Sequence, residues 1–357
     1  MKKVILVLFL IIAIYLIVIL CYATYHDYQP EEITLVKPDQ TAQTTIITTD
    51  TISLLTWNIG YGGLGSESDF FYADGRIFLS GGMMIRPPEK VVNKNIAGFL
   101  KTIKEHPADL YLLQEVDQAA KRSYYNNQYA AIGEVHPTYE RSFGTNLLTA
   151  YSPVPLLEPW RTYGYTNSGL ATYSRFAASQ ITRLQLPGKF SWPSRLFLLD
   201  RCALEHRYPT DNGKELIVYN IHNSAYDKDG SIKRQQTEYL KKRWLDEYEA
   251  GNYVVIGGDW NQVPPNFAAN FFRPQTPVEG NPNIAPELMP AEWRWIFDPT
   301  VPTVRDTREI YTEKETFTGL IDFFLVSPNI RALKVTAIDL NFQYSDHQPV
   351  KVELLLQ

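Results

Sequence analysis

The N-terminal 25 residues differ sharply from the rest of the chain in their hydrophobic pattern. Lys2 and Lys3 precede an uncharged, mostly apolar run from Val4 to Tyr25. A helix needs about 20 such residues to cross a bilayer, whereas the apolar part of a signal peptide usually has about 7–15. Residues 1–25 are therefore predicted to form an uncleaved transmembrane anchor, with a cleaved signal segment as the alternative. The two lysines favour a cytoplasmic N-terminus, which places the remaining residues outside the cytoplasm, membrane-anchored or, after cleavage, secreted.

Residues 26–50 have the composition of a linker, and residues 51–357 are predicted to form one domain. The linker contains Pro30, Pro38 and a threonine-rich tract, although its last residues could begin a strand. No fixed-period repeat and no second linker follows it.

Beyond residue 51, apolar positions follow either the two-residue period of strands or the 3.6-residue period of helices. The helical pattern covers three segments, Glu89–Glu105, Asp117–Gln128 and Ser231–Ala250. The strand pattern covers Ile52–Ile59, Asp109–Glu115, Gly169–Ser174, Ile181–Leu186, Phe197–His206, Glu215–His222, Tyr253–Gly257, Ile321–Val326, Lys334–Leu340 and Pro349–Leu355. Many strands interleaved with fewer helices predict two packed sheets covered by helices.

Composition allows this architecture and restricts the partners. A chain of 357 residues that is 45% hydrophobic can bury a large core. The net charge of −5 argues against a strongly basic nucleic-acid surface, but not against a site that handles phosphate through bound cations. Of the two cysteines, Cys21 lies in the apolar run and Cys202 in a predicted strand, so we expect no disulfide and a buried, unreactive Cys202.

Chemically active side chains recur at the ends of predicted strands. Asn58 closes one strand before a Gly-rich loop, and Glu115 ends an apolar strand, where an uncompensated carboxylate is costly. Asp259 and Asn261 follow Gly257-Gly258 and aim two oxygen donors at one region, as hard cations such as Mg²⁺ prefer. Taken singly, these residues have ordinary explanations: a turn for Asn58, a salt bridge for Glu115 and an Asx-type turn for the last pair.

Four further residues add acid and imidazole groups. Asp322 lies in an apolar strand, and Asp346-His347 precedes the last strand. Neighbouring side chains on one backbone diverge, so Asp322 is the candidate acid to orient His347 as a base. His222 ends another strand, where a hydrogen-bonded core histidine is the ordinary interpretation.

In this order, these segments resemble the endonuclease/exonuclease/phosphatase superfamily, which includes deoxyribonuclease I, apurinic endonucleases, bacterial sphingomyelinases and inositol polyphosphate 5-phosphatases. The likeness spans residues 52–355 and rests on Trp57-Asn58, Gln114-Glu115, His222, Gly258-Asp259-Trp260-Asn261, Ile321-Asp322 and Ser345-Asp346-His347. Each motif is unspecific alone, but six in fixed order are hard to obtain by chance. The resemblance implies a four-layer α/β sandwich of two mostly antiparallel sheets flanked by helices, with the site at one edge of both sheets.

The resemblance also implies a metal site and a phosphate site. Asn58, Glu115 and Asp346 would hold or surround Mg²⁺, with Mn²⁺ or Ca²⁺ as alternatives. Arg175, at a strand end that resembles the superfamily's Ser-Arg motif, would either reach phosphate or be a solvated charge.

The remaining roles concern the attacking water. Asp259 and Asn261 would orient it or a second metal and contact the phosphate, and Asp322 would orient His347 as general base. His222 would stabilise the pentacovalent phosphorane or protonate the leaving oxygen.

The function implied is a divalent-metal-dependent phosphodiester hydrolase, with an extracytoplasmic endonuclease as the first expectation. A sphingomyelinase-like phospholipase C, an inositol phosphatase and a non-catalytic binding protein that retains the fold are the alternatives. Nucleic acid or a phospholipid headgroup is the expected substrate, the membrane is the expected partner of the N-terminal helix, and no obligate protein partner is inferred. The proline- and aromatic-rich segment Phe267–Ile296 is expected either to shape substrate choice or to cover a sheet edge.

Overall fold

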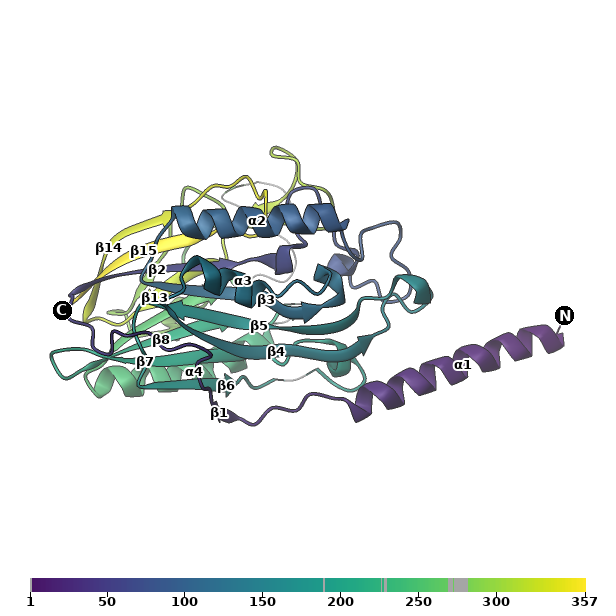
Figure 1. Cartoon of the computed structure of the whole chain (residues 1–357), viewed down its shortest axis with the longest axis horizontal. Coiled ribbons are helices and arrows are strands. Elements are labelled where there is room, and N and C mark those ends of the chain that lie inside the picture. Colours follow the sequence, from purple (N-terminus) through teal and green to yellow (C-terminus); the bar gives the residue numbers. More distant parts are fainter. Residues whose placement is uncertain (1, 189, 226, 228–229, 269–271, 273–281) are drawn as a thin grey trace.

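Two packed β-sheets form the centre of the protein, and helices cover both outer faces (Figure 1). The computed structural model describes residues 2–357 except 189, 226, 228–229, 269–271 and 273–281. The part of the insertion 267–296 that falls in the last two gaps lies outside the described residues.

One sheet has six strands in the order β14-β15-β2-β3-β5-β4. Only β2 and β3 are parallel neighbours in it. In chain order the strands are β2 (Thr51–Asn58), β3 (Leu110–Ala120), β4 (Glu140–Ser152), β5 (Gly164–Ser174), β14 (Ile330–Ala337) and β15 (Val350–Leu356).

The other sheet has seven strands in the order β1-β6-β7-β8-β9-β13-β10, and only β8 and β9 are parallel. Its strands are β1 (Ile33–Leu35), β6 (Gln180–Gln185), β7 (Cys202–Pro209), β8 (Glu215–His222), β9 (Tyr253–Asp259), β10 (Arg294–Ile296) and β13 (Asp322–Val326). A separate pair joins β11 (Val304–Arg305) to β12 (Thr318–Gly319).

Three hydrophobic clusters account for the layers, because residues along each strand alternate between the two faces of its sheet. Leu54 of β2 packs between the sheets with Val218 of β8, whereas its neighbour Leu55 faces the helices α2 (Glu89–Glu105) and α3 (Gln128–Val135). On the far side, Trp244 of α4 (Ser231–Glu249) covers the seven-stranded sheet. The predicted four-layer sandwich is confirmed. Short 3-10 helices occupy Gly60–Gly62, Phe71–Asp74, Lys121–Ser123, Pro159–Arg161, Ser194–Phe197 and Pro286–Leu288.

Polar side chains also cross the space between the two sheets. The Gln114 amide on β3 donates to Asn220 Oδ1 on β8 over 2.8 Å. Ser142 Oγ on β4 lies 2.8 Å from His206 Nε2 on β7, and the His206 ring stacks beside Tyr208. These bonds therefore link buried polar groups across the sandwich.

The N-terminal helix α1 (Lys2–Tyr25) extends away from the domain (Figure 1) and is long and apolar enough to cross a membrane, a property that a signal sequence near the N-terminus shares. The segment after it differs from the expected free linker. Its β1 pairs with β6, and Ile47 is only 1% exposed in the core between the sheets. Thr44 and Ile47 also form bridges to Phe176 and Thr210. This segment therefore packs along the domain through backbone pairing at a sheet edge and the buried side chain of Ile47.

Several predicted elements need correction. No helix covers 117–128: β3 continues through Asp117 to Ala120 because it pairs with β5, and α3 starts later, capped by the Asn127 side chain. The strand expected at 197–206 begins at Cys202, and the one expected at 334–340 runs from Ile330 to Ala337. The 13-residue strand β4 was not predicted, since its buried face carries Glu140, Ser142, Gly144 and Asn146 rather than apolar residues.

Candidate active site

The ends of five core strands meet at one edge of the sandwich. Asn58 ends β2 beside Gln114 of the parallel strand β3, and His222 ends β8 opposite Asp259 of the parallel strand β9. Asp322 begins β13 opposite Asp259 because these two strands are antiparallel. The residues before β15 lie at the same edge, since β15 runs antiparallel to β2. Both sheets thus contribute to a single site.

Asp259 is the centre of this site. Its Oδ2 accepts the Asn58 amide over 3.1 Å, and it lies 3.3 Å from His222 Nε2 and 3.8 Å from His347 Nε2. Its Oδ1 accepts the backbone N–H of Asn261 over 2.9 Å. One fully buried carboxylate therefore contacts residues from four segments of the chain.

The approach of β8 to β9 depends on Gly258. Its φ is +151°, and a Cβ there would lie 2.0 Å from the carbonyl oxygen of Ile221. No side chain fits that space, so glycine lets β8 and β9 place His222 against Asp259.

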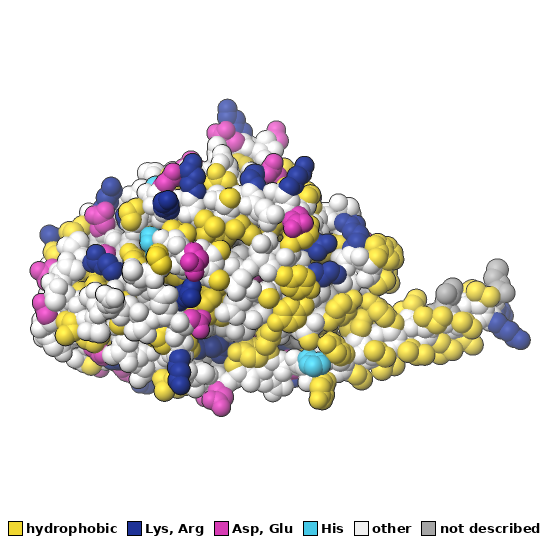
Figure 2. Space-filling view, viewed as in Figure 1, with side chains coloured by type: hydrophobic (Ala, Val, Ile, Leu, Met, Phe, Trp, Pro, Cys, Tyr) yellow, Lys and Arg dark blue, Asp and Glu magenta, His cyan; other side chains and the backbone are white. Residues whose placement is uncertain are grey.

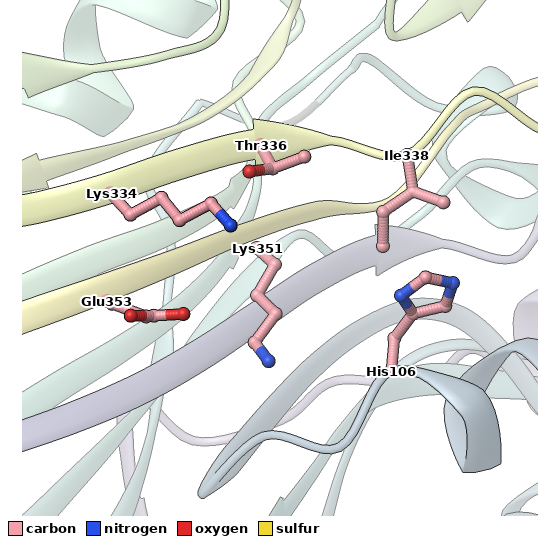
Figure 3. Close-up of a pocket in the computed structure, with 6 residues that line it drawn as sticks. All are labelled: His106, Lys334, Thr336, Ile338, Lys351 and Glu353. Atoms are coloured by element: carbon pink, nitrogen blue, oxygen red, sulfur yellow. The ribbon is translucent and has the colours of Figure 1, made fainter.

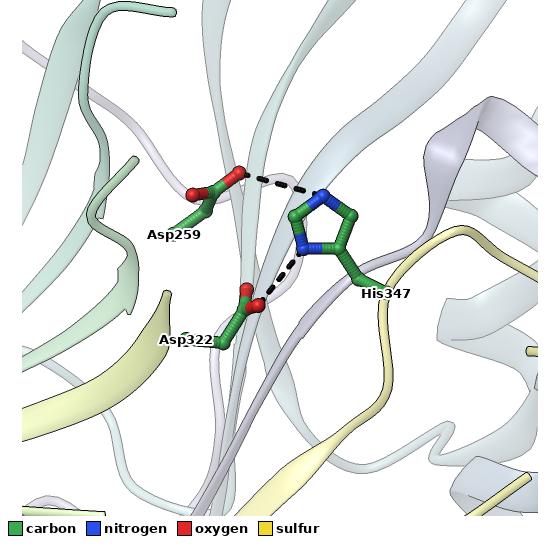
Figure 4. A group of neighbouring side chains, drawn as sticks. All are labelled: Asp259, Asp322 and His347. Atoms are coloured by element: carbon green, nitrogen blue, oxygen red, sulfur yellow. Dashed lines mark hydrogen bonds and ion pairs between the residues drawn. The ribbon is translucent and has the colours of Figure 1, made fainter. Parts of the chain in front are cut away.

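His347 and Asp322 form a second close pair (Figure 4). His347 Nδ1 lies 2.9 Å from Asp322 Oδ2, while its Nε2 points to Asp259. The Thr303 hydroxyl accepts the Asp322 backbone N–H over 3.0 Å, and the Trp57 indole donates to the His347 carbonyl over 2.9 Å. These contacts fix the backbone on both sides of the pair.

Glu115 reaches the site through an irregularity in β3. The register with β5 shifts between Leu113 and Val116, and Glu115 has a φ of +54°. A bulge re-aims a side chain, and here it points Glu115 Oε1 to within 3.4 Å of the Asn58 amide nitrogen and 4.0 Å of His222 Nε2. The Glu115 side chain is 24% exposed, so it can meet an incoming ligand.

Asp346 lies on the other side of Asn58. The Ser345 hydroxyl donates to the Asn58 carbonyl over 2.7 Å and to Asp346 Oδ1 over 3.3 Å. Gly60 has a φ of +50°, and a Cβ there would come within 2.8 Å of Asp346 Oδ1. The Gly-rich loop after Asn58 thus packs closely against this carboxylate.

The proton affinities of the acids reflect their burial. Burial raises the pKa of Glu115 against the opposing charge of Arg122, and burial also raises the pKa of Asp346. Burial raises the pKa of Asp322 to about 6, and the positive charge of His347 limits the rise.

The pKa values of the two histidines are shifted in opposite directions. Burial, helped by the charge of Arg201, holds the pKa of His222 well below its usual value. Burial alone would also lower the pKa of His347, but the carboxylates of Asp322, Asp259 and Asp346 outweigh it and hold that pKa well above the usual value. The site therefore favours a neutral His222 beside a protonated His347.

Buried cations surround the acids, and none was anticipated from the sequence. Arg122 donates to Asp117 through two nitrogens over 2.8 and 3.2 Å, and its guanidinium lies 3.8 Å from the centre of the Tyr61 ring. Arg201 is 7% exposed, and its charge acts on both His222 and Glu115. Lys233 is completely buried, and burial lowers its pKa to about 8 despite the nearby charges of Asp227 and Asp259.

A sequence signal existed only for Lys233, which falls on the buried stripe of α4 with Gln236, Thr237, Leu240 and Trp244. A lysine at a core-facing helical position is unusual and suggests a specific partner.

Arg175 is not brought to this site. It follows Ser174, the last residue of β5, which pairs with Leu110 at the start of β3. Glu115 lies further along β3, in the opposite direction. There it forms an ion pair with Asp109 over 3.0 Å with half of its side chain exposed. The solvated strand-end charge is therefore the interpretation that fits, and we assign Arg175 no contact with phosphate.

A pocket of about 350 Å³ lies on another part of the surface, lined by His106, Lys334, Thr336, Ile338, Lys351 and Glu353 (Figure 3). It contains no residue of the acidic cluster. We assign it no role in the chemistry.

Asp259, Asp322 and His347 offer ligand atoms within 4.8 Å of one another and so could hold a metal ion (Figure 4). His347 Nδ1 already bonds to Asp322 Oδ2, so this atom is not available to a cation. Glu115 and Asp346 supply carboxylate oxygens, the kind of ligand that Mg²⁺ prefers, and Asn58 adds a side-chain amide between Glu115 and Asp259. The site therefore has donors for a cation on one side of Asp259 and an acid–imidazole pair on the other.

Comparison with known proteins agrees with this architecture. A sequence model described as the endonuclease/exonuclease/phosphatase family matches residues 55–347. A search of curated proteins found no match.

Solved structures share the fold at low sequence identity. An endonuclease/exonuclease/phosphatase from Beutenbergia cavernae has a TM-score of 0.55 at 15% identity, covering 86% of this chain and 72% of that one. The human nocturnin catalytic domain with bound sulfate has a TM-score of 0.52 at 16% identity, covering 87% and 97%. The 2',3'-cyclic phosphatase ANGEL2, in complex with adenosine-2',3'-vanadate, has a TM-score of 0.51 at 14% identity, covering 90% and 99%. With most of its length matched by the family model, this chain belongs to the endonuclease/exonuclease/phosphatase family.

Proposed function

We propose that this protein is a divalent-metal-dependent hydrolase of phosphodiesters. The observation that carries the proposal is the position of Asp259, which contacts an imidazole paired with Asp322 and, through Asn58, adjoins Glu115. A base and a cluster of oxygen donors at one edge are the parts that hydrolysis of a phosphoester requires.

Glu115, Asn58 and Asp346 are the residues that would hold the cation. Their donors are carboxylate or amide oxygens, which suit Mg²⁺, with Mn²⁺ or Ca²⁺ as alternatives. Asn58 now directs its amide nitrogen to the carboxylates and its oxygen to the Gly60 N–H over 3.0 Å. A half-turn of the amide would give up the bond to Gly60 and present the oxygen to the cation. A bound cation supplies positive charge that offsets the negative charge of the phosphate.

The protein's own groups then manage the proton and the phosphate oxygens. His347, which the carboxylates of the site hold protonated, would become neutral where a bound cation offsets their charge. The neutral ring then takes a proton from the attacking water, and Asp322 fixes the ring and stabilises the imidazolium that results. Asp259 and Asn261 orient the water. Because burial keeps His222 neutral, we assign it a hydrogen bond to a phosphate oxygen rather than the role of general acid. The water oxygen bonds to phosphorus, and the bond to the ester oxygen breaks. That oxygen takes a proton from solvent and leaves as an alcohol, a phosphomonoester remains, and His347 returns its proton to solvent.

We further propose that α1 is a retained membrane anchor with the domain outside the cytoplasm. Its length and composition support a span, and Lys2 and Lys3 support the orientation. On family resemblance alone, nucleic acid is the first candidate substrate and a lipid headgroup is the second.

The test is turnover by the full chain in detergent or vesicles. Bis(4-nitrophenyl) phosphate, plasmid DNA, phospholipid vesicles and inositol phosphates should each be assayed with Mg²⁺ and with EDTA. We expect Mg²⁺-dependent hydrolysis of at least one phosphodiester, reduced about 10²–10⁴-fold in His347→Gln and in Asp259→Asn. His106→Gln, in the remote pocket, is the matched control and should keep the wild-type rate.

Two results would contradict the proposal. Wild-type rates in both site variants would remove the assigned roles. Absence of turnover on every substrate would favour the binding protein that retains the fold.

A further inference from the structure

Two loops place an exposed group of large apolar side chains on the surface, and we call this group the apolar tip. It consists of Ile77, Phe78, Leu79, Leu157 and Trp160, which are 40%, 57%, 53%, 49% and 74% exposed. The Leu156 N–H donates to the Ile77 carbonyl over 2.8 Å, and the Leu157 N–H donates to the Phe78 carbonyl over 2.9 Å. The two loops therefore form one unit, and exposed apolar groups of this size usually mark an interaction surface.

The apolar tip and the catalytic edge share one support. Beneath the tip, Phe71 and Met83 pack with Val154 and Tyr163 in a small separate core. The Tyr163 hydroxyl accepts a hydrogen bond from Arg122 over 2.7 Å, and Arg122 stacks on Tyr61 of the loop that follows Asn58. The tip is thus connected to the site through a few buried contacts.

The same end of the six-stranded sheet carries the site, the tip and α1. Ser152 at the end of β4 pairs with Gly164, beyond the Val116–Gly169 pair that adjoins Glu115, so the loop of the tip leaves the sheet beyond the site. α1 contacts β4, with Tyr15 beside Tyr151. Figure 1 shows α1 leaving the domain at this end, and Figure 2 shows hydrophobic side chains continuing from α1 onto the adjoining domain surface.

The contact with α1 fixes the height of the domain relative to a bilayer. A span that starts at Val4 ends near Ala23, after about 20 residues. The side of α1 at Tyr15, Ile19 and Ala23 is covered by the domain, and Ile19 and Ala23 are 8% and 7% exposed. Tyr15 lies eight residues before Ala23, or about 12 Å at the rise of a helix. The end of β4 therefore lies beside the outer-leaflet part of the span. Apolar side chains are favoured there, and irregular backbone is tolerated only where protein covers it, as the hydrogen bonds between the two loops and the contact of β4 with α1 do here.

Charged and aromatic side chains near the tip and at the end of α1 also fit contact with a bilayer surface. Arg76, Arg86 and Arg161 flank it and are exposed, and Arg161 also forms an ion pair with Glu158 over 3.4 Å. Trp192 is 53% exposed and donates its indole N–H to Thr24 Oγ1 over 3.2 Å at the end of α1. Tryptophan concentrates at the membrane–water boundary, and arginines attract anionic headgroups.

We propose that the apolar tip inserts into the outer leaflet of the bilayer that α1 spans, with the three arginines against anionic headgroups. The docking itself requires only that α1 is retained. Docking turns the catalytic edge toward the bilayer surface, so the phosphodiester within reach is that of a lipid headgroup. This last step rests on the proposed function.

The docking is tested by placing a fluorophore on the full chain in vesicles of phosphatidylcholine and phosphatidylglycerol. In a Cys21→Ser background, an environment-sensitive label is attached at Phe78→Cys, Trp160→Cys or, as control, Leu333→Cys. Leu333 is 46% exposed on β14, away from α1. Vesicles that contain brominated lipid should quench the labels at 78 and 160 but not at 333. Labels at 78 and 160 that behave like the label at 333 would overturn the docking.

The presentation of substrate is tested with the double variant Phe78→Ser/Trp160→Ser. It should lose hydrolysis of a phosphodiester carried in the vesicle and keep the wild-type rate on soluble bis(4-nitrophenyl) phosphate. If the double variant also keeps the wild-type rate on the phosphodiester in the vesicle, the presentation of lipid is refuted. If the wild type hydrolyses neither substrate, the proposed function fails, while the quenching result still decides the docking.

Discussion

His206 should make the stability of the sandwich depend on pH. The ring is 1% exposed, and its Nε2 lies 2.8 Å from Ser142 Oγ. Burial lowers its pKa from 6.5 to about 3. The unfolded chain therefore takes up a proton below pH 6.5, whereas the folded chain does not until about pH 3. The stability due to neutral His206 is complete above pH 6.5 and is lost as the pH falls toward 3.

The size of the effect follows from these two pKa values. At pH 5 the unfolded side chain is 1.5 pH units below its pKa of 6.5, and the folded one is still neutral. At about 1.36 kcal/mol per unit, acidification from pH 8 to pH 5 costs about 2 kcal/mol at this residue.

Urea unfolding of the full chain at pH 8 and pH 5 measures this difference. Other groups titrate as well, so the wild type is compared with His206→Gln, whose amide can still bond to Ser142 but does not ionise. The free energy of unfolding should fall by about 2 kcal/mol more in the wild type than in the variant. His106→Gln, at a half-exposed histidine, is the control. Its free energy of unfolding should depend on pH as in the wild type. Identical pH dependence in wild type and His206→Gln would refute the reasoning, because it would mean that the folded ring binds its proton as readily as the unfolded one.

Three other predictions concern the site and the N-terminal segment. Asp322→Asn should lower kcat about 10²–10⁴-fold with little change in thermal stability, because it removes the carboxylate that orients His347; an unchanged kcat would argue against the pair. Mg²⁺ at 100 times its Kd should stabilise the wild type by about 3 kcal/mol in thermal unfolding, and Glu115→Gln should lose most of this gain; equal gains would place the cation elsewhere. A fragment of residues 45–357 should unfold at lower urea than one of residues 26–357, because it lacks the pairing of β1 with β6; equal midpoints would show that β1 adds no stability.

The sequence identified the strand-end residues because their chemistry conflicts with their surroundings. Glu115 and Asp322 are acids in apolar strands, and each lies in the site. Asp259 and His347 could be placed together only through the resemblance, since nothing in local spacing shows that residues 88 positions apart meet.

The parts that were missed depend on contacts distant in the sequence. β4 escaped because apolar periodicity cannot reveal a strand whose buried face is polar. Arg122 and Arg201 look like ordinary surface charges in the sequence and become buried only when the sheets and loops assemble. Arg175 is the opposite case, since its local motif matched while the strand direction carried it to the wrong end of the sheet.

The bond between Gln114 and Asn220 has a consequence for the precision of catalysis. Gln114 immediately precedes Glu115, and Asn220 stands two residues before His222, so this bond joins the two halves of the active site at their base. Apolar side chains alone tolerate sliding of one layer over the other, because the hydrophobic effect has no direction. A slip by a single residue, about 3.3 Å, would separate Glu115 from His222 and Asp259 while leaving both layers covered. The Asn220 amide also donates to the carbonyls of Leu113 and Ala171 in the same sheet as Gln114. These directional bonds together set the alignment of the layers, so Asn220→Leu should spare the fold and impair turnover.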